Sequence, residues 1–211
     1  IMKQLKAAGH RLVIPFSVKD EVEKIKDNMM LKGEHNLQNA IAAYHACSAA
    51  AVSEEEIFAG MRTFPGLPHR QFPVRIINNI TYINDSKATN AEAASKALAS
   101  YDNIYWIAGG RPKEGGLDGL EKLAGRVRES FLIGEAMDDF AAWMSKNNIT
   151  HHKNKTLDAA VQAAHMAAQK NQSATVLLAP ACASFDQFSS YEERGDAFTN
   201  IVNSLEESAA A

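Results

Sequence analysis

The sequence predicts an open α/β fold, in which helices cover both faces of a mostly parallel sheet. Short apolar segments of strand length alternate with amphipathic segments of helix length along most of the chain. The strand segments are apolar at almost every position, which is typical of strands buried on both faces. One pair of them is joined by Asn78-Asn79, two residues that tolerate the positive φ of a tight turn, so one hairpin is expected.

The first sixty-five residues are expected to form a unit separate from the rest. Their predicted elements are a helix end over 2–8, a strand over 11–16, a charged segment over 19–27 that is either a loop or a short helix, and helices that begin near His35 and Ser53. Ser53 and Glu56 have the spacing of a capping box. Two prolines and a glycine in the segment 64–68 end the last of these helices. We therefore predict two units, residues 1–65 and residues 66–211.

The second unit has the regular alternation of strands and helices. Its strands are expected over 74–77, 80–83, 104–108, 131–133, near 150 and over 175–178. Helices are expected where apolar residues recur at spacings of three and four, over 91–101, 117–127, 137–144, 157–168 and 198–205.

The composition excludes several classes of protein. The chain has 211 residues, of which 46% are hydrophobic and 22% are charged, and its net charge of -3 provides no basic field for a nucleic acid. Cys47 and Cys182 lack the spacing of a zinc site or a disulfide framework. No apolar run reaches the roughly 20 residues of a membrane span. We expect a cytoplasmic protein without a nucleic-acid or membrane partner.

Polar residues and glycines gather where three predicted strands end. Ligands of open α/β sheets bind beyond the carboxyl ends of the strands. The loops that carry this polar equipment are 84–90, 109–116 and 179–186. Each leads toward a helix whose N-terminus favours an anion, and Lys87, Arg111 and Lys113 add positive charge. The loops therefore predict a site for a small anionic metabolite.

Each feature also has a purely structural interpretation. Asp85 alone fits a helix N-cap, and Gly109-Gly110 alone fits a turn because it lacks the spacing of a dinucleotide fingerprint. Cys182 fits a packed core residue because no sequence signal supplies it with a base. Basic loop residues are usually solvated. The prediction of a site depends on the three loops coming together.

Five sequence blocks resemble the D-glutamate-adding branch of the Mur ligase family. The blocks are Gly33-Glu34-His35-Asn36-Leu37-Gln38-Asn39, Gly66-Leu67-Pro68-His69-Arg70, Asp85-Ser86-Lys87-Ala88-Thr89-Asn90, Gly109-Gly110 with Lys113, and Pro180 to Phe188 followed by Glu193-Arg194-Gly195. They occur in this order over almost the whole chain. Sister branches of the family differ at the first and the last block.

The resemblance implies a three-domain enzyme with an N-terminal domain for the UDP moiety, a central ATPase domain and a Rossmann-like C-terminal domain. This chain would supply the end of the central domain over 1–65 and the C-terminal domain over 66–211. The motif G-x-x-x-x-G-K-[ST] does not occur in the sequence. The family's modified lysine and magnesium ligands would lie outside the chain, so no metal ligand is expected in it.

The resemblance also implies a bacterial ligase of peptidoglycan precursors that uses ATP and Mg²⁺ to join D-glutamate to UDP-N-acetylmuramoyl-L-alanine through an acyl phosphate. Matching motif positions place Asn36, Asn39, Arg70 and Asp85 at ATP, Lys87 with Asp85 in catalytic roles near the transferring phosphate, and Thr89, Lys113, Ser184, Phe185 and Tyr191 at D-glutamate. Tyr191 stands where the family pattern leads us to expect Phe.

A chain without the ATPase motif is expected to be inactive alone, and the intact protein is expected to be a monomer. The alternative is a stand-alone Rossmann-like module that binds a small anion without catalysis.

Overall fold

A computed structural model describes residues 17, 19, 21–31, 33–171 and 173–206 of the chain. The chain divides into two compact units, Ile1–Pro65 and Gly66–Ala211. The division falls within the proline- and glycine-containing segment 64–68. The helix end and the strand expected over 2–8 and 11–16 lie outside the described residues.

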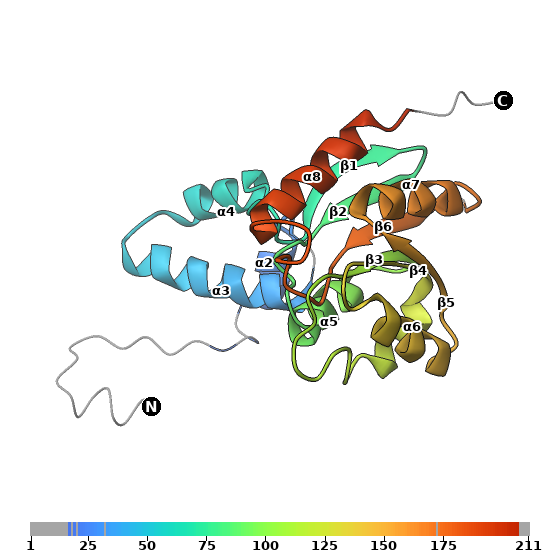
Figure 1. The fold of residues 1–211 in the computed structure, drawn as a ribbon. Coiled ribbons are helices and arrows are strands. Elements are labelled where there is room, and N and C mark those ends of the chain that lie inside the picture. The colour runs from blue at the N-terminus through green and yellow to red at the C-terminus, as the bar shows by residue number, and fades with distance from the viewer. Residues whose placement is uncertain (1–16, 18, 20, 32, 172, 207–211) are drawn as a thin grey trace. The chain divides into compact units, whose positions relative to one another are not determined.

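The described part of the first unit is helical (Figure 1). Its helices are α2 (Val22–Lys26), α3 (Glu34–Ala49) and α4 (Glu54–Thr63). The charged segment 19–27 thus contains a short helix. The predicted capping box starts α4, because Ser53 Oγ accepts from the backbone N–H of Glu56 while the Glu56 carboxylate accepts from the backbone N–H of Ser53. A small apolar cluster holds the helices together around Ile25, Leu37, Ile41 and Phe58.

The second unit is built on a six-stranded sheet. Its strands are β1 (Phe72–Ile77), β2 (Ile80–Asn84), β3 (Ile104–Gly109), β4 (Val127–Ile133), β5 (Thr150–Lys155) and β6 (Ala174–Leu178), in the spatial order β1-β2-β6-β3-β4-β5. β1 and β2 form the predicted antiparallel hairpin, in which Asn78 and Asn79 have φ of 47° and 64°. The other neighbouring strands are parallel. The predicted mostly parallel α/β fold with one hairpin is confirmed.

Helices cover both faces of this sheet (Figure 1). They are α5 (Ala91–Ser100), α6 (Met137–Lys146), α7 (Leu157–Ala168) and α8 (Tyr191–Ser204). α5 and α6 pack with Trp106 and Leu132 of the sheet on one face. α7 and α8 pack with Tyr82, Ile107 and Phe131 on the other. Side chains that alternate along each strand therefore enter two separate cores, which explains why the central strands are apolar throughout. None of the described helices combines the length and the apolar character of a membrane span.

The predicted helix over 117–127 is wrong. This stretch consists of turns and a short 3₁₀ segment, η1 (Glu121–Arg126), and Val127 is already the first residue of β4. Glycines just before and within this stretch explain the difference. Gly115, Gly116 and Gly119 have φ of 84°, 51° and 88°, values that an α-helix does not contain. The apolar spacing suggested a helix, but the backbone of these glycines prevents one.

Candidate functional site

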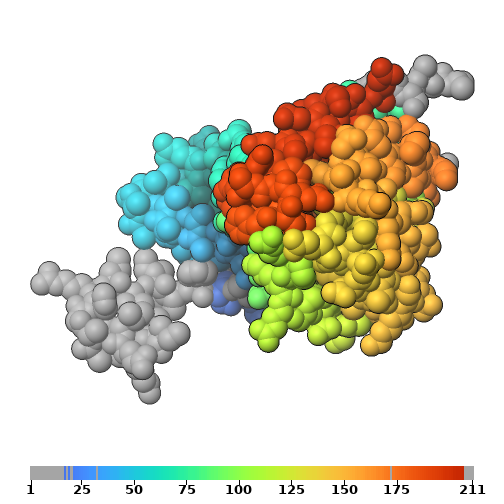
Figure 2. All heavy atoms as spheres, viewed as in Figure 1, coloured from blue at the N-terminus to red at the C-terminus, as the bar shows by residue number. Residues whose placement is uncertain are grey.

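The three polar loops of the second unit come together because β2, β6 and β3 are neighbours in the sheet. Parallel strands place their carboxyl ends at the same edge. The N–H of Ala181 donates to the carbonyl of Ala88 at 2.9 Å, which joins the loops after β6 and β2. Arg111 and Ala183 exchange backbone hydrogen bonds of 2.9 and 3.1 Å, which join the loops after β3 and β6. Figure 2 shows the orange-red segment that follows β6 beside the yellow-green segment that follows β3.

Two glycines allow the loop after β3 to approach its neighbours. Gly109 and Gly110 have φ of 123° and 131°. A Cβ atom on Gly109 would lie 2.0 Å from the carbonyl oxygen of Ile133, and one on Gly110 would lie 2.3 Å from that of Ala183. Any larger residue would therefore push the loop away from β4 and from the loop after β6. The pair is more than a turn, since it sets the spacing between parts of the site.

A buried arginine ties the loops after β2 and β6 together. Arg194 on α8 is only 1% exposed. Its Nε donates to Ser86 Oγ at 3.0 Å and its Nη2 donates to the Ser86 carbonyl at 2.9 Å, while Nη1 and Nη2 both donate to the carbonyl of Cys182 at 3.2 Å. Burial lowers the pKa of Arg194 to about 10. The guanidinium thus holds both loops through their own polar atoms.

The sequence contains a signal for a buried arginine at this position. The matching block Glu193-Arg194-Gly195 assigns no role to Arg194, but its spacing on the helix does. It is spaced by four from Phe198, which is spaced by four from Val202, and all three are buried on one side of α8. A charged residue in line with a core stripe predicts a buried, fully hydrogen-bonded group.

Asp85 follows β2 as a buried carboxyl group. Its Oδ1 accepts from the backbone N–H of Gln71 at 3.2 Å. Burial raises the pKa of Asp85 to about 7, although this hydrogen bond and the charge of Arg70 act in the opposite direction. A carboxyl group with a perturbed pKa at the ligand-binding edge of a sheet is a candidate functional group.

Lys87 lies over the ring of Tyr191. Its Nζ is 3.8 Å from the ring centroid, well within the range of a cation–π interaction. Tyr191 is the first residue of α8, and its carbonyl accepts from Ser86 Oγ at 2.8 Å. The loop after β2 and the start of α8 therefore hold the Lys87 ammonium between them.

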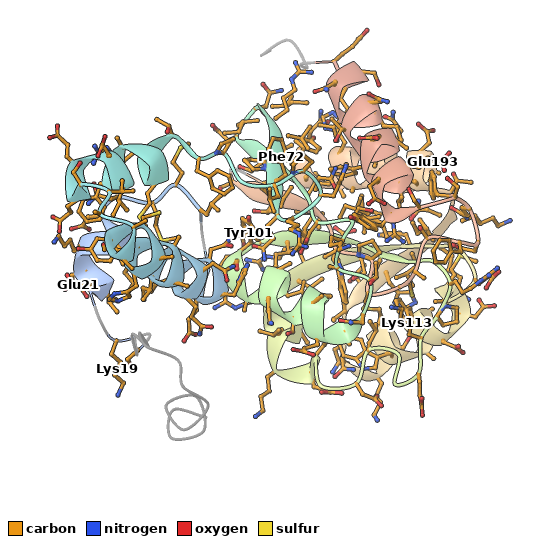
Figure 3. All side chains as sticks on the ribbon, turned by 90° about the vertical axis from the view of Figure 1, so that its left-hand side faces the viewer. Lys19, Glu21, Phe72, Tyr101, Lys113 and Glu193 are labelled. Atoms are coloured by element: carbon orange, nitrogen blue, oxygen red, sulfur yellow. The ribbon has the colours of Figure 1, made fainter. Side chains whose placement is uncertain are left out.

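The remaining expected D-glutamate residues differ in exposure. Ser184 is 2% exposed and Thr89 is half-buried, whereas Lys113 is exposed and Phe185 is 62% exposed. Figure 3 labels Lys113 on the loop after β3. Burial raises the pKa of Cys182 to about 12, so the thiol between these loops is protonated at neutral pH. It is a packed residue, in line with its structural interpretation.

The residues expected at ATP lie on both units. Asn36 and Asn39 are one helical turn apart on α3 of the first unit, where Asn36 is half-buried and Asn39 is exposed. Arg70 is exposed in the segment before β1 of the second unit. Among the described residues, no group of three or more His, Cys, Asp and Glu side chains could hold a metal ion.

The fold and the converging loops define an α/β domain whose polar loops meet at the carboxyl edge of a mostly parallel sheet. No family model matches the chain. The UDP-N-acetylmuramate-alanine ligase of Thermotoga maritima shares the fold, with a TM-score of 0.61 at 15% sequence identity, over 83% of this chain and 39% of that one.

Curated relatives give the more specific assignment. The chain is 53% identical to the UDP-N-acetylmuramoylalanine-D-glutamate ligase of Agrobacterium fabrum over 178 residues, which are 83% of this chain and 38% of the relative. It is 45% identical to the ligase of the same name from Rhizobium johnstonii over 206 residues, 97% of this chain and 42% of the relative. The chain belongs to the family of UDP-N-acetylmuramoylalanine-D-glutamate ligases and spans about two fifths of the length of these relatives.

Proposed function

We propose that the protein containing this chain is an ATP-dependent ligase that adds D-glutamate to UDP-N-acetylmuramoyl-L-alanine during the synthesis of peptidoglycan precursors. The chain itself contributes the D-glutamate subsite and part of the ATP site. The observation that carries this proposal is the meeting of the loops after β2, β3 and β6 in a chain 53% identical to a D-glutamate ligase.

In this proposal, the three loops bind D-glutamate. A substrate with two carboxylates needs several donors in fixed positions. Thr89, Lys113, Ser184, Phe185 and Tyr191 would contribute hydroxyl, ammonium and backbone donors. Each charge-assisted hydrogen bond contributes about 1.5 to 3 kcal/mol. A few such contacts explain how a chain with a net charge of -3 holds an acidic amino acid, since local donors replace a global positive field.

Lys87 is assigned to the transferring phosphoryl group. ATP supplies this group to the alanine carboxylate of the UDP-linked substrate, and the amine of D-glutamate then displaces phosphate. Positioning and electrostatic stabilisation dominate such transfers. The ammonium of Lys87 would balance the charge of the phosphoryl oxygens without forming a covalent bond. Its contact with the Tyr191 ring supports this assignment, because a held charge needs little reorganisation.

Asn36, Asn39, Arg70 and Asp85 are assigned to ATP. The donor set fits the nucleotide, since amides and a guanidinium bind the base and phosphates while a carboxylate accepts hydrogen bonds from ribose hydroxyls. The Mg²⁺ ligands are assigned to the rest of the protein. Because the sequence contains no G-x-x-x-x-G-K-[ST] motif, we expect this chain to have no ligase activity by itself.

Phosphate release by the full-length protein tests the proposal. We expect release from ATP only when D-glutamate and UDP-N-acetylmuramoyl-L-alanine are both present. Lys113→Ala should raise the KM for D-glutamate about tenfold, the effect of losing one charge-assisted contact. Lys96→Ala is the matched control, because Lys96 is exposed on α5 and forms an ion pair with Glu92 one turn away, so the KM of this variant should not change.

Two results would contradict the proposal. An unchanged KM in Lys113→Ala would remove this residue from the D-glutamate subsite. Binding of D-glutamate by the full-length protein without any phosphate release would favour the binding module over the ligase.

A further inference from the structure

A histidine without an assigned role packs against Tyr191, whose ring contacts the Lys87 ammonium. His69, in the segment before β1, has a side chain that is 12% exposed. Its ring meets the Tyr191 ring edge-on, with centroids 6.2 Å apart and an interplanar angle of 78°. Asn84 Nδ2 lies 3.3 Å from its Nδ1, and Asp196 Oδ1 lies 3.6 Å from its Nε2. The ring is therefore fixed by groups from β2 and α8.

The fold makes room for this ring. Gly195 lies inside α8, where glycine is less favourable than alanine. A Cβ atom at this position would lie 2.1 Å from His69 Nδ1. The carbonyl of Gly195 also accepts a hydrogen bond from Asn84 Nδ2 at 2.8 Å. Gly195 therefore leaves room for the His69 ring and also binds Asn84, which lies beside that ring. The packing of the His69 ring thus depends on residues of both β2 and α8.

His69 reaches Lys87 in two ways. Its carbonyl accepts from the backbone N–H of Lys87 at 3.0 Å, which fixes the start of that side chain. Its ring supports the Tyr191 ring, over which the other end of the side chain lies. We propose that His69 is a positioning residue that holds the Lys87 ammonium, through the ring of Tyr191, where phosphoryl transfer needs it.

This inference rests on the proposed function, which gives Lys87 its role. A lysine side chain has many rotamers, and its charge is most effective when it is in place before the substrate arrives. Glu192 lies on the same side, since a hydrogen bond from Tyr191 and, to a smaller extent, the charge of Lys87 lower the pKa of Glu192. The contact with the Tyr191 ring keeps the Lys87 ammonium over the ring instead of in an ion pair with Glu192.

The first arm of the test measures the position of Lys87 without using activity. In the full-length protein labelled with ¹³C-lysine, the ring current of Tyr191 should shift the ε-proton signals of Lys87 upfield, and Lys87→Arg assigns these signals. The shift should persist in Tyr191→Phe and disappear in Tyr191→Leu. It should also disappear in His69→Ala but remain in His69→Phe, which restores the edge-on contact. If His69→Ala does not fold, His69→Gln removes the aromatic contact with less loss of volume.

The second arm measures phosphate release with both substrates present. His69→Ala should lower kcat about tenfold and change the KM for D-glutamate less than twofold, because positioning acts on the transfer step. His69→Phe should recover most of the rate. In a Lys87→Ala background, His69→Ala should have no further effect, since the two residues act as one unit. His152→Ala is the matched control and should leave kcat unchanged, because His152 pairs with Glu129 on the far strands.

The two arms separate the possible failures. An upfield shift that survives in His69→Ala overturns the inference, whatever the rate. A lost shift with an unchanged kcat also overturns it, because the held ammonium would then not serve the transfer. A wild-type protein that releases no phosphate refutes the proposed ligase itself, while the lysine signals still report whether His69 holds Lys87.

Discussion

The two sides of the candidate site present positive charge differently. Around β2 and β6, Lys87 lies over an aromatic ring, and the adjacent backbone is tied to the buried Arg194. After β3, the tightly packed backbone ends near Gly110, and Arg111 and Lys113 extend into solvent. Arg111 makes an exposed ion pair with Glu135 at 3.2 Å, and no ion pair joins Lys113 to any described residue. The side around β2 and β6 is therefore preorganised, whereas the basic side chains after β3 are exposed and can adopt other rotamers.

The largest expected effect lies within the loop after β3. Gly110→Ala should lower the free energy of unfolding by about 5 kcal/mol, because it combines a strained φ with a backbone clash. Gly115→Ala, at φ of 84° with no atom within 4 Å of the added Cβ, should cost only about 1–2 kcal/mol. Urea denaturation of this chain would measure both. Similar losses would mean that the packed part of the loop extends beyond Gly110.

The next effect concerns Asp85, on the preorganised side around β2 and β6. Its pKa is about 7 in the folded chain against an ordinary value of 3.8, so the folded state binds the proton more tightly than the unfolded state. The contribution of Asp85 to stability is therefore fully present below pH 4 and is lost as the pH rises through 7, by up to about 4 kcal/mol. Asp85→Asn should remove this component of the pH dependence. Asp118→Asn, an exposed residue of the other loop, should retain it. Parallel stability curves for the wild-type chain and Asp85→Asn would refute the raised pKa.

A smaller effect compares the arginines of the two sides. Arg194→Ala leaves the carbonyls of Ser86 and Cys182 buried without their donors, so we expect a loss of about 3 kcal/mol in the free energy of unfolding. Arg111→Ala removes an exposed ion pair and should leave stability unchanged within error. Equal effects in thermal unfolding would contradict the distinction between the two sides.

Much of the fold could be predicted because it depends on local patterns. Alternating apolar and amphipathic segments identify most strands and helices, and Asn78-Asn79 identifies the hairpin. The rule that ligands bind at the carboxyl ends of strands selected the loops that meet in the structure. The helix prediction over 117–127 failed because turns can also place apolar residues three positions apart. The positive φ values of the glycines exclude a helix here.

The contacts that hold the site could not be predicted in the same way. Arg194 binds Ser86, which lies 108 residues earlier in the sequence, and the edge-on contact of His69 with Tyr191 joins the segment before β1 to α8. Such contacts depend on strand order, which no local pattern specifies. Sequence blocks select candidate residues, but only the structure shows that Lys87 and Ser184 are held by the surrounding fold while Lys113 and Phe185 are exposed.

The position of β6 also has a consequence for how the second unit folds. The last of the described strands, β6, lies between two earlier ones: Ala174 pairs with Ile80 on one side, and Thr175 pairs with Ile104 on the other. During synthesis, the edges of β2 and β3 that pair with β6 remain unpaired until this central strand has been made. Pairings between residues so far apart in sequence close large loops and slow folding. The site formed by the loops proposed to bind D-glutamate is therefore expected to be among the last parts to assemble. A chain cut before Ala174 would keep the loops after β2 and β3 but would lack β6 and the loop that follows it.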